Sequence, residues 1–220
     1  MILPDKIIRS NRRTLSISVD SFGRLIVRAP KRYGEERIFA FLRQKESWIL
    51  RKKAERAGAG IQLPPENIHG YRLLFVGSEY EICVTETKKV YADVEEKKIY
   101  VPMQKSQERL VRWLKEQALN LFESLTEKKS QEMGAAYKSV KVTSARSRWG
   151  CCTAENALRF SFRLLYAPLP VIEYVVVHEL AHTVHKNHSP YFWREVEKYI
   201  PAYKTERKWL KIHSALMEIF

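Results

Sequence analysis

The stretch of sequence that decides the fold is His178-Glu-Leu-Ala-His182-Thr-Val-His185-Lys-Asn-His188. On a helix, His178 and His182 lie one turn apart on the same face, about 6 Å from each other. Their imidazoles can therefore converge on one metal ion. Glu179, the next residue, can reach a water held beside the metal without binding the metal itself. The pattern predicts a metal-dependent hydrolytic site with Glu179 as the general base.

The helix that carries this motif is otherwise apolar. Pro170 is suited to the first turn of such a helix, which we expect to run to about Lys186. Its remaining residues suit a buried element, namely Val175, Val176, Val177, Leu180, Ala181 and Val184. Burying two histidines and a glutamate there without partners is costly. A shared metal ion supplies the compensation, so a pair of ordinary core histidines is the weaker interpretation.

A third ligand must come from outside this pair. His185 is on the same helical face but about 10 Å along the axis from the first histidine, which is out of reach in a regular helix. His188 lies past the expected helix end, where Asn187 is suited to a left-handed turn that brings the chain back. We expect His188 to be the ligand. The alternatives are His185 and two carboxylates of the next helix, Glu195 and Glu197.

Three histidines and an open fourth position are typical of catalytic zinc. We therefore expect one Zn²⁺ per chain and the hydrolysis of a peptide or protein substrate. A purely structural zinc site is the alternative, but such a site has no need of Glu179 and tends to close its fourth position. Arg148 and Tyr191 are candidates for contacts with the substrate or with the oxyanion. The strand expected at 158–165, or that at 140–144, could pair with an extended substrate.

The rest of the chain predicts an α+β fold in two parts. Residues 1–103 form a β-rich N-terminal portion with one helix, expected from Glu35 to about Arg56, and a linker made by Gly58-Ala-Gly60 and Pro64-Pro65. Strands are expected there at 14–20, 24–29, 73–76, 80–84, 90–94 and 99–101. Residues 104–220 form the catalytic domain, which begins with a long helix from Ser106 to Gly134.

The formal net charge of +14 is concentrated near the N-terminus. Residues 1–56 contain 15 Lys or Arg against 6 Asp or Glu, whereas the other 164 residues contain 24 against 19. A solvated basic face explains this excess. The alternative is a nucleic-acid-associated protein, or a protease of nucleic-acid-bound proteins, with weak and salt-sensitive binding. The candidate contacts are Arg12, Arg13, Arg24 and Arg28.

The amino-acid composition excludes disordered, disulfide-rich and membrane-spanning classes of protein. Hydrophobic residues make up 45% of the 220 residues, which excludes disorder of the whole chain. The three cysteines include the neighbours Cys151 and Cys152, which form no disulfide framework and indicate a reducing compartment. No apolar run approaches the length of a membrane helix. We therefore expect a cytoplasmic protein without a membrane partner.

Together these residues resemble the YgjP-like metal-dependent hydrolases, a family of zincin-type metallopeptidases. The resemblance rests on Arg148-Trp149-Gly150-Cys-Cys152, on Tyr174–His182, on Asn187-His188-Ser189 with Phe192-Trp193, and on Trp209-Leu210. Residues 15–19, 27–30 and 45–49 are also similar, so the resemblance covers nearly the whole chain. It implies a zincin-like domain, zinc at His178, His182 and His188, and a catalytic Glu179. A more distant similarity links the chain to the SprT-like and WLM metalloproteases.

Overall fold

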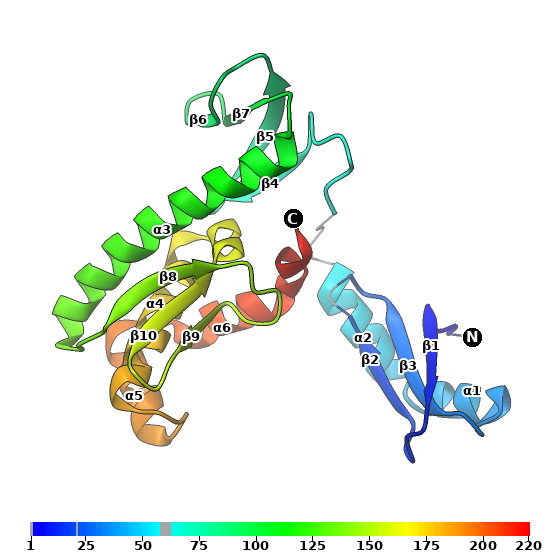
Figure 1. Cartoon of the computed structure of the whole chain (residues 1–220). Coiled ribbons are helices and arrows are strands. Elements are labelled where there is room, and N and C mark those ends of the chain that lie inside the picture. The colour runs from blue at the N-terminus through cyan, green and yellow to red at the C-terminus, as the bar shows by residue number, and fades with distance from the viewer. Residues whose placement is uncertain (1, 21, 58–62) are drawn as a thin grey trace. The chain divides into compact units, whose positions relative to one another are not determined.

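The computed structural model describes residues 2–20, 22–57 and 63–220, and residues 58–60 of the expected linker lie outside them. The chain is α+β, as the sequence predicts, and forms two compact units (Figure 1). The first unit comprises Met1–Gln62 with Ile212–Ala215, and the second comprises Leu63–Lys211 with Leu216–Phe220. The sequence predicts a division between residues 103 and 104 instead. Residues 63–103 thus group with the second unit rather than with the first.

The first unit packs a three-stranded sheet against two helices. The strands are β1 (Lys6–Ser10), β2 (Ser16–Val19) and β3 (Leu25–Pro30), and the helices are α1 (Glu35–Gln44) and α2 (Glu46–Ala57). β3 is central, antiparallel to β2 and parallel to β1. Alternate residues of β3 are fully buried because successive side chains of a strand point to opposite faces. These residues, Leu25, Val27 and Ala29, form one core with Ile38, Leu42 and Ile49 of the helices.

Two features of this unit differ from expectation. β1 has no counterpart among the predicted strands, because its Ile7-Ile8 pair does not show the alternation of a half-buried strand. The single helix predicted at 35–56 is broken at Lys45, whose N–H donates to the carbonyls of both Phe41 and Leu42, at 3.1 Å each. The break lets both helices pack against the same sheet.

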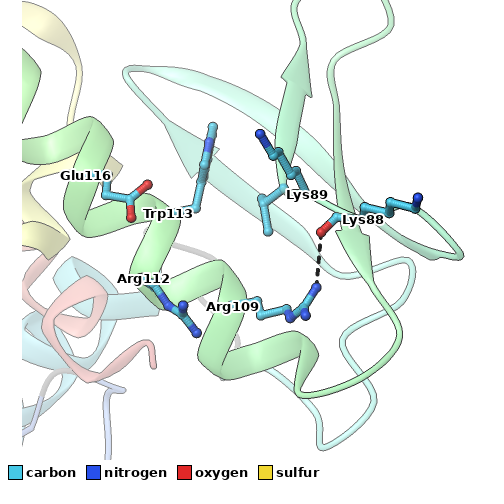
Figure 2. A pocket seen from close by; sticks show the side chains of 7 residues that line it. Lys88, Lys89, Arg109, Arg112, Trp113 and Glu116 are labelled. Atoms are coloured by element: carbon cyan, nitrogen blue, oxygen red, sulfur yellow. Dashed lines mark hydrogen bonds between the residues drawn. The ribbon is translucent and has the colours of Figure 1, made fainter.

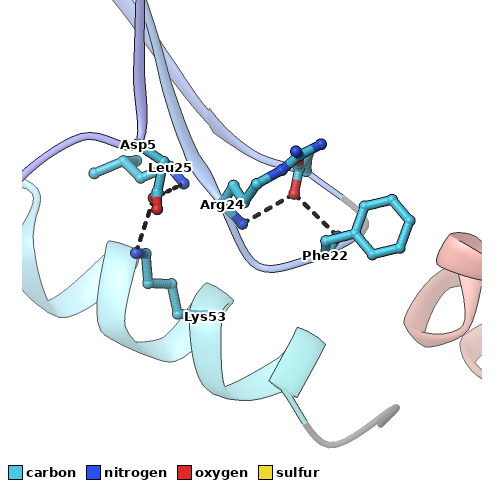
Figure 3. A network of polar contacts seen from close by, with 6 residues as sticks. Asp5, Phe22, Arg24, Leu25 and Lys53 are labelled. Atoms are coloured by element: carbon cyan, nitrogen blue, oxygen red, sulfur yellow. Dashed lines mark hydrogen bonds and ion pairs between the residues drawn. The ribbon is translucent and has the colours of Figure 1, made fainter. Parts of the chain in front are cut away.

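A polar network ties the start of the chain to β3 and α2 (Figure 3). The Asp5 carboxylate accepts hydrogen bonds from the Leu25 amide at 2.6 Å and from the Lys53 ammonium at 3.1 Å. The Leu25 amide bond is the main reason that the pKa of Asp5 lies below its usual value, with Lys53 acting in the same direction. At the β2–β3 turn, Asp20 accepts from the Arg24 side chain at 2.7 Å.

The second unit begins with a four-stranded sheet in the order β4-β5-β7-β6. Its strands are β4 (Arg72–Phe75), β5 (Ser78–Thr85), β6 (Tyr91–Asp93) and β7 (Lys98–Pro102), close to the four predicted runs. α3 (Ser106–Met133) follows and ends at Gly134, whose φ of 63° is the left-handed conformation that glycine adopts without strain. The buried face of α3 has helical spacing, with Leu110, Leu114, Ala118, Phe122, Thr126 and Lys129.

A second sheet lies beside α3 in this unit. Its order is β8-β10-β9, with β8 (Ser139–Thr143) parallel and β9 (Gly150–Cys152) antiparallel to the central β10 (Ala157–Ser161). β9 was not expected as a strand. The strand predicted over 158–165 is wrong beyond Ser161, where a 3-10 helix, η1 (Phe162–Tyr166), takes over. All five of its residues are buried, so the apolar run carries no alternation to separate the two structures.

The chain ends in a group of helices that carries the histidine motif. These are α4 (Leu169–Val184), α5 (Pro190–Tyr199), α6 (Tyr203–Ile212) and the 3-10 helix η2 (Ser214–Glu218). α4 packs against α3, α5 and β9. Within the described residues, no helix combines the length and hydropathy that crossing a bilayer requires.

Candidate metal centre

α4 carries three of the residues singled out by the sequence. It is buried along most of its length, and its Glu179 side chain is among the few buried charged groups of the described residues. His178 and His182 share one face with ring centroids 4.9 Å apart, which is the consequence of their one-turn spacing. α4 is therefore a buried apolar helix with a polar face near its carboxyl end.

Three imidazoles meet at this face. One nitrogen of each of His178, His182 and His188 lies within 4.8 Å of the others. The Nε2 atoms of His178 and His188 are 3.1 Å apart. Two nitrogens that each lie 2.0–2.1 Å from a tetrahedral zinc ion would be about 3.3 Å apart. The His178–His188 spacing therefore matches one such ion, and a small movement of the third imidazole completes a donor set of three nitrogens.

The chain returns to α4 through a short turn. His185 caps the helix, and its carbonyl accepts a hydrogen bond from Nδ1 of His182 at 2.9 Å. This bond places the proton of His182 on Nδ1 and leaves Nε2 free to bind a metal. Asn187 is not left-handed, contrary to expectation: its side chain accepts from the Ser189 amide at 3.3 Å instead. His185 thus contributes a backbone carbonyl, and its side chain is outside the histidine cluster.

α5 supports the three imidazoles from one side. Ser189 caps this helix by accepting from the Phe192 amide at 3.4 Å, as expected for a Ser-Pro start. The Phe192 ring is fully buried and lies 4.5–4.9 Å from the rings of His178, His182 and His188. The first turn of α5 therefore fixes the floor of the cluster.

A stack of rings holds His188, the most exposed of the three histidines. Its imidazole stacks on Trp193 at 5.5 Å, and Trp193 stacks on Tyr203 at 5.3 Å. The Arg207 guanidinium lies over the Trp193 ring at 4.9 Å. This support cannot be predicted from spacing in the sequence, because residues 193, 203 and 207 become neighbours only when α6 folds back on α5.

The Glu179 carboxyl lies against β9. A Cβ atom at Gly150 would be 2.8 Å from Oε1 of Glu179 and 2.9 Å from its Cγ, closer than such contacts occur. Burial raises the pKa of Glu179 to about 7, although the Cys152 amide and the Arg148 charge both act to lower it. A carboxyl with a pKa near neutrality exchanges protons readily at physiological pH. The glycine at position 150 is the feature of the sequence that could have indicated this close approach of the carboxyl to β9.

The histidines are kept neutral by the same environment. Burial, followed by the charges of His182, His188 and Arg207, lowers the pKa of His178 to about 3. Burial also lowers the pKa of His182. The hydroxyl of Tyr174 is 3.5 Å from Nδ1 of His178, opposite the nitrogen that faces the cluster. Neutral imidazole is the form that binds metals.

The other candidate residues are placed less centrally. Arg148 is exposed in the segment before β9, close enough for its charge to act on Glu179. Tyr191 is 65% exposed, and its ring contacts the Arg194 guanidinium at 4.8 Å. Glu195 and Glu197 are not among the residues that gather with the histidines in the described chain.

The edge of the second sheet that contacts α4 is β9. β10 has a neighbour on each side and offers no free edge, so the expected pairing of residues 158–165 with a substrate is wrong. β9 and β8 are the two edges, so the expected pairing at residues 140–144, which lie mostly in β8, stays a prediction. Cys152 of β9 lies near Glu179, and burial is the main reason that the pKa of its thiol is raised.

The N-terminal arginines lie in the first unit, and two of them have internal partners. Arg24 forms an ion pair with Asp20 at 2.7 Å, and Arg28 donates to the Ser18 hydroxyl at 3.0 Å. Arg12 has a weak contact with Thr14 at 3.4 Å, and Arg13 is exposed. Nucleic-acid binding stays a prediction that nothing in the described part of the chain supports.

Comparison with known proteins gives one family. The sequence model described as "YgjP-like, metallopeptidase domain" matches residues 13–213. No curated protein matches the chain. The metallopeptidase zymogen abylysin of Pyrococcus abyssi is 24% identical and covers 43% of this chain and 94% of its own, with a TM-score of 0.38. The zymogen jannalysin of Methanocaldococcus jannaschii is 17% identical and covers 43% and 96%, also with a TM-score of 0.38.

Proposed function

The chain belongs to the family of YgjP-like metallopeptidase domains, and from this premise we propose that it is a zinc peptidase with one ion bound by His178, His182 and His188. The observation that carries the ligand set is the convergence of three imidazole nitrogens within 4.8 Å, beside a buried carboxyl group. Membership of the family makes the chain a metal-dependent peptidase, which acts on peptides or proteins. The choice of zinc rests on the donors, because three imidazoles and an open position suit catalytic zinc.

The chemistry divides between the ion and the chain. When bound, zinc polarises a carbonyl and lowers the pKa of water toward about 7. Glu179 accepts the proton of the attacking water and delivers it to the leaving amine. Its pKa of about 7 suits both transfers, since a group with a pKa near the working pH gives and takes protons with similar ease. Gly150 leaves the space in which the carboxyl moves between the two.

The substrate binds as an additional strand at β9. β9 is an edge strand in contact with α4, so a peptide paired with it runs past the histidine cluster. Main-chain hydrogen bonds to an edge bind extended peptides with little regard to sequence, and adjacent side chains supply the specificity. Arg148, which is exposed beside Glu179, is the better placed of the two candidates for a contact with the oxyanion or the substrate. Tyr191, whose ring contacts the Arg194 guanidinium rather than the histidine cluster, serves as the alternative.

Metal analysis of purified variants tests the ligand set. His178→Ala, His182→Ala and His188→Ala should each abolish stoichiometric zinc, because two imidazoles bind it far more weakly than three. His185→Ala should keep one zinc per chain, since only its carbonyl takes part. Loss of zinc from His185→Ala together with retention by His188→Ala would show that the third ligand is wrongly assigned.

Glu179→Gln tests the base. This variant keeps the shape of the side chain and all three ligands, so it should retain zinc but cleave a fluorogenic peptide library at least about 100-fold more slowly. Glu173→Gln, on the same helix and outside the cluster, is the matched control and should cleave at the parent rate. Equal turnover by Glu179→Gln and the parent, with zinc content verified in both, excludes the mechanism.

A further inference from the structure

A pocket of about 310 Å³ lies in the second unit between α3 and the segment that joins β5 to β6 (Figure 2). The pocket lies beside the four-stranded sheet β4-β5-β7-β6. None of its lining residues is a proposed metal ligand or the proposed base. Three lining residues come from the segment between the strands, and four come from one side of α3. These are Lys88, Lys89, Val90, Arg109, Arg112, Trp113 and Glu116.

The pocket is strongly cationic. Four of the lining side chains are positive, whereas Glu116 alone is negative. Some exposed cations elsewhere in the unit have carboxylate partners, as in the Arg72–Glu79 and Lys98–Glu96 pairs. Across the described residues, none of the four cations of the pocket forms such a pair. Arg109 donates instead to the Lys88 carbonyl at 3.2 Å, which fixes the segment to α3 and leaves both charges unneutralised (Figure 2).

An aromatic residue gives the pocket an apolar wall. Trp113 is half-buried and packs against Phe75 with ring centroids 5.4 Å apart, so its orientation is fixed from behind by the sheet. In Figure 2 the Trp113 and Lys89 side chains lie next to each other and point the same way. A ligand that fills this space meets an apolar face surrounded by cations.

A second hollow of about 420 Å³ extends the pocket. It shares Lys88 and Arg109 with the first, and adds Pro102 and the 61% exposed Met103. Two adjoining hollows suit an extended ligand rather than a small ion. Two carboxylates, Glu116 in one hollow and Glu86 in the other, interrupt the cations and disfavour a continuous phosphate backbone. The arrangement favours a ligand with separate negative groups and apolar side chains between them.

We propose that these two hollows, here called the basic groove, bind an acidic and extended segment of a protein substrate. Asp or Glu side chains of that segment pair with Lys89, Arg109 and Arg112, and an apolar side chain contacts Trp113. The groove thereby adds affinity away from the scissile bond. Its role in substrate docking rests on the proposed peptidase function, whereas the binding of the segment does not.

Fluorescence anisotropy with labelled peptides tests the binding. The probe is a twelve-residue peptide in which Asp and Glu alternate on both sides of one central Leu. In the control peptide, every Asp is replaced by Asn and every Glu by Gln. The acidic peptide should bind at least about tenfold more tightly, and the difference should shrink as salt screens the pairs. Lys89→Glu combined with Arg112→Glu should remove this preference. Lys128→Glu, an exposed charge reversal elsewhere on α3, should preserve it.

Several results would overturn the proposal. Equal affinity for the acidic and the neutral peptide is one, and an unchanged preference in the double variant is another. A single-stranded oligonucleotide that outcompetes the acidic peptide would assign the groove to nucleic acid instead. Circular dichroism of the double variant establishes that the variant is folded, and Lys89→Gln with Arg112→Gln gives a second, milder pair that should lower the preference by less.

Cleavage assays separate this proposal from the proposed function. Fusing the acidic segment to a cleavable peptide should lower KM for the parent, leave kcat unchanged, and have no effect on KM in the double variant. If no peptide is cleaved while the acidic probe still binds in a groove-dependent way, the proposed function fails and the binding site stands. If fusion leaves KM of the parent unchanged, docking is excluded even though cleavage proceeds.

Discussion

The glycine at position 150 determines where the Glu179 carboxyl, the proposed base, can lie. The missing side chain of Gly150 is the space that the Glu179 carboxyl occupies. Gly150→Ala should therefore push the carboxyl aside and lower peptidase activity by about tenfold or more, since displacements of about 1 Å in an active site cost this much. Metal content should not change, because the atoms nearest to a Cβ at position 150 belong to Glu179 and not to a proposed ligand.

Gly34→Ala is the control for this prediction. Gly34 has no atom near the site of a new Cβ and an ordinary negative φ of −64°, so its variant should cleave at the parent rate. Parent-like activity of Gly150→Ala would show that the Glu179 carboxyl does not need its present position.

The raised pKa of Glu179 should lower the free energy of unfolding of the metal-free protein at neutral pH. The folded state keeps the proton up to a pKa of about 7, whereas the unfolded chain releases it near the usual 4.5. This group therefore stabilises the fold fully below pH 4.5, and its contribution is lost as pH rises toward 7. Glu179→Gln does not titrate. Its free energy of unfolding should exceed that of the parent increasingly with pH, by at most about 3 kcal/mol at pH 8.

Urea denaturation of both proteins in a chelating buffer at pH 5 and pH 8 measures this difference. Titration of the histidines cancels, because both proteins contain them. A gap between the two proteins that is the same at both pH values contradicts the raised pKa.

At the scale of residues, the sequence predicts what spacing alone determines. His178, Glu179 and His182 follow from helix geometry, and their approach in the structure requires nothing else. His188 was the preferred third ligand among four candidate residues. Spacing in the sequence does not determine the path of the turn after α4, so it could not decide between them. Gly150 and Tyr174 entered only through the family resemblance and without a role, since the role of each depends on a partner distant in the sequence or on the fold.

At the scale of elements, the α5–α6 pair supports the histidine that is not on α4. His188 rests on Trp193, which is backed by Tyr203 and covered by Arg207. Trp193→Ala should leave His188 free to move and weaken zinc binding about 10- to 100-fold, the usual effect of losing a residue that orients a ligand. Trp193→Phe keeps a stacking ring and should recover most of the affinity.

Competition with a chromophoric chelator measures these affinities without any activity assay. Tyr191→Ala changes an exposed ring of the same helix and should bind zinc as the parent does. A Trp193→Ala variant with unchanged affinity would mean that the ring stack is packing alone.

Elements with a clear period or a clear end were predicted well. α3 ends at the expected glycine, and α5 begins at the expected Ser189 cap. The errors fall where tertiary contacts decide. β9 is three residues long and exists only by pairing with β10, and the helix at 35–56 breaks because both halves pack on one sheet.

At the scale of the whole molecule, two units with separate cores share one chain. The first unit carries most of the basic excess, but Asp20 and Ser18 engage two of its arginines. The cations of the basic groove lie in the second unit, and none of them has a carboxylate partner among the described residues. Nothing in the sequence pattern predicts this groove. Net charge counts residues, whereas a binding surface depends on which charges lack partners.

The three proposed ligands lie within eleven consecutive residues, and this closeness affects the order in which the enzyme is assembled. Closing so short a loop costs little chain entropy, so the end of α4 and the turn after it suffice for chelation. The base is different, because its carboxyl depends on β9, more than twenty residues earlier in the chain. A refolding chain can thus bind its ion early, and it becomes able to cut peptides only when the second sheet has formed.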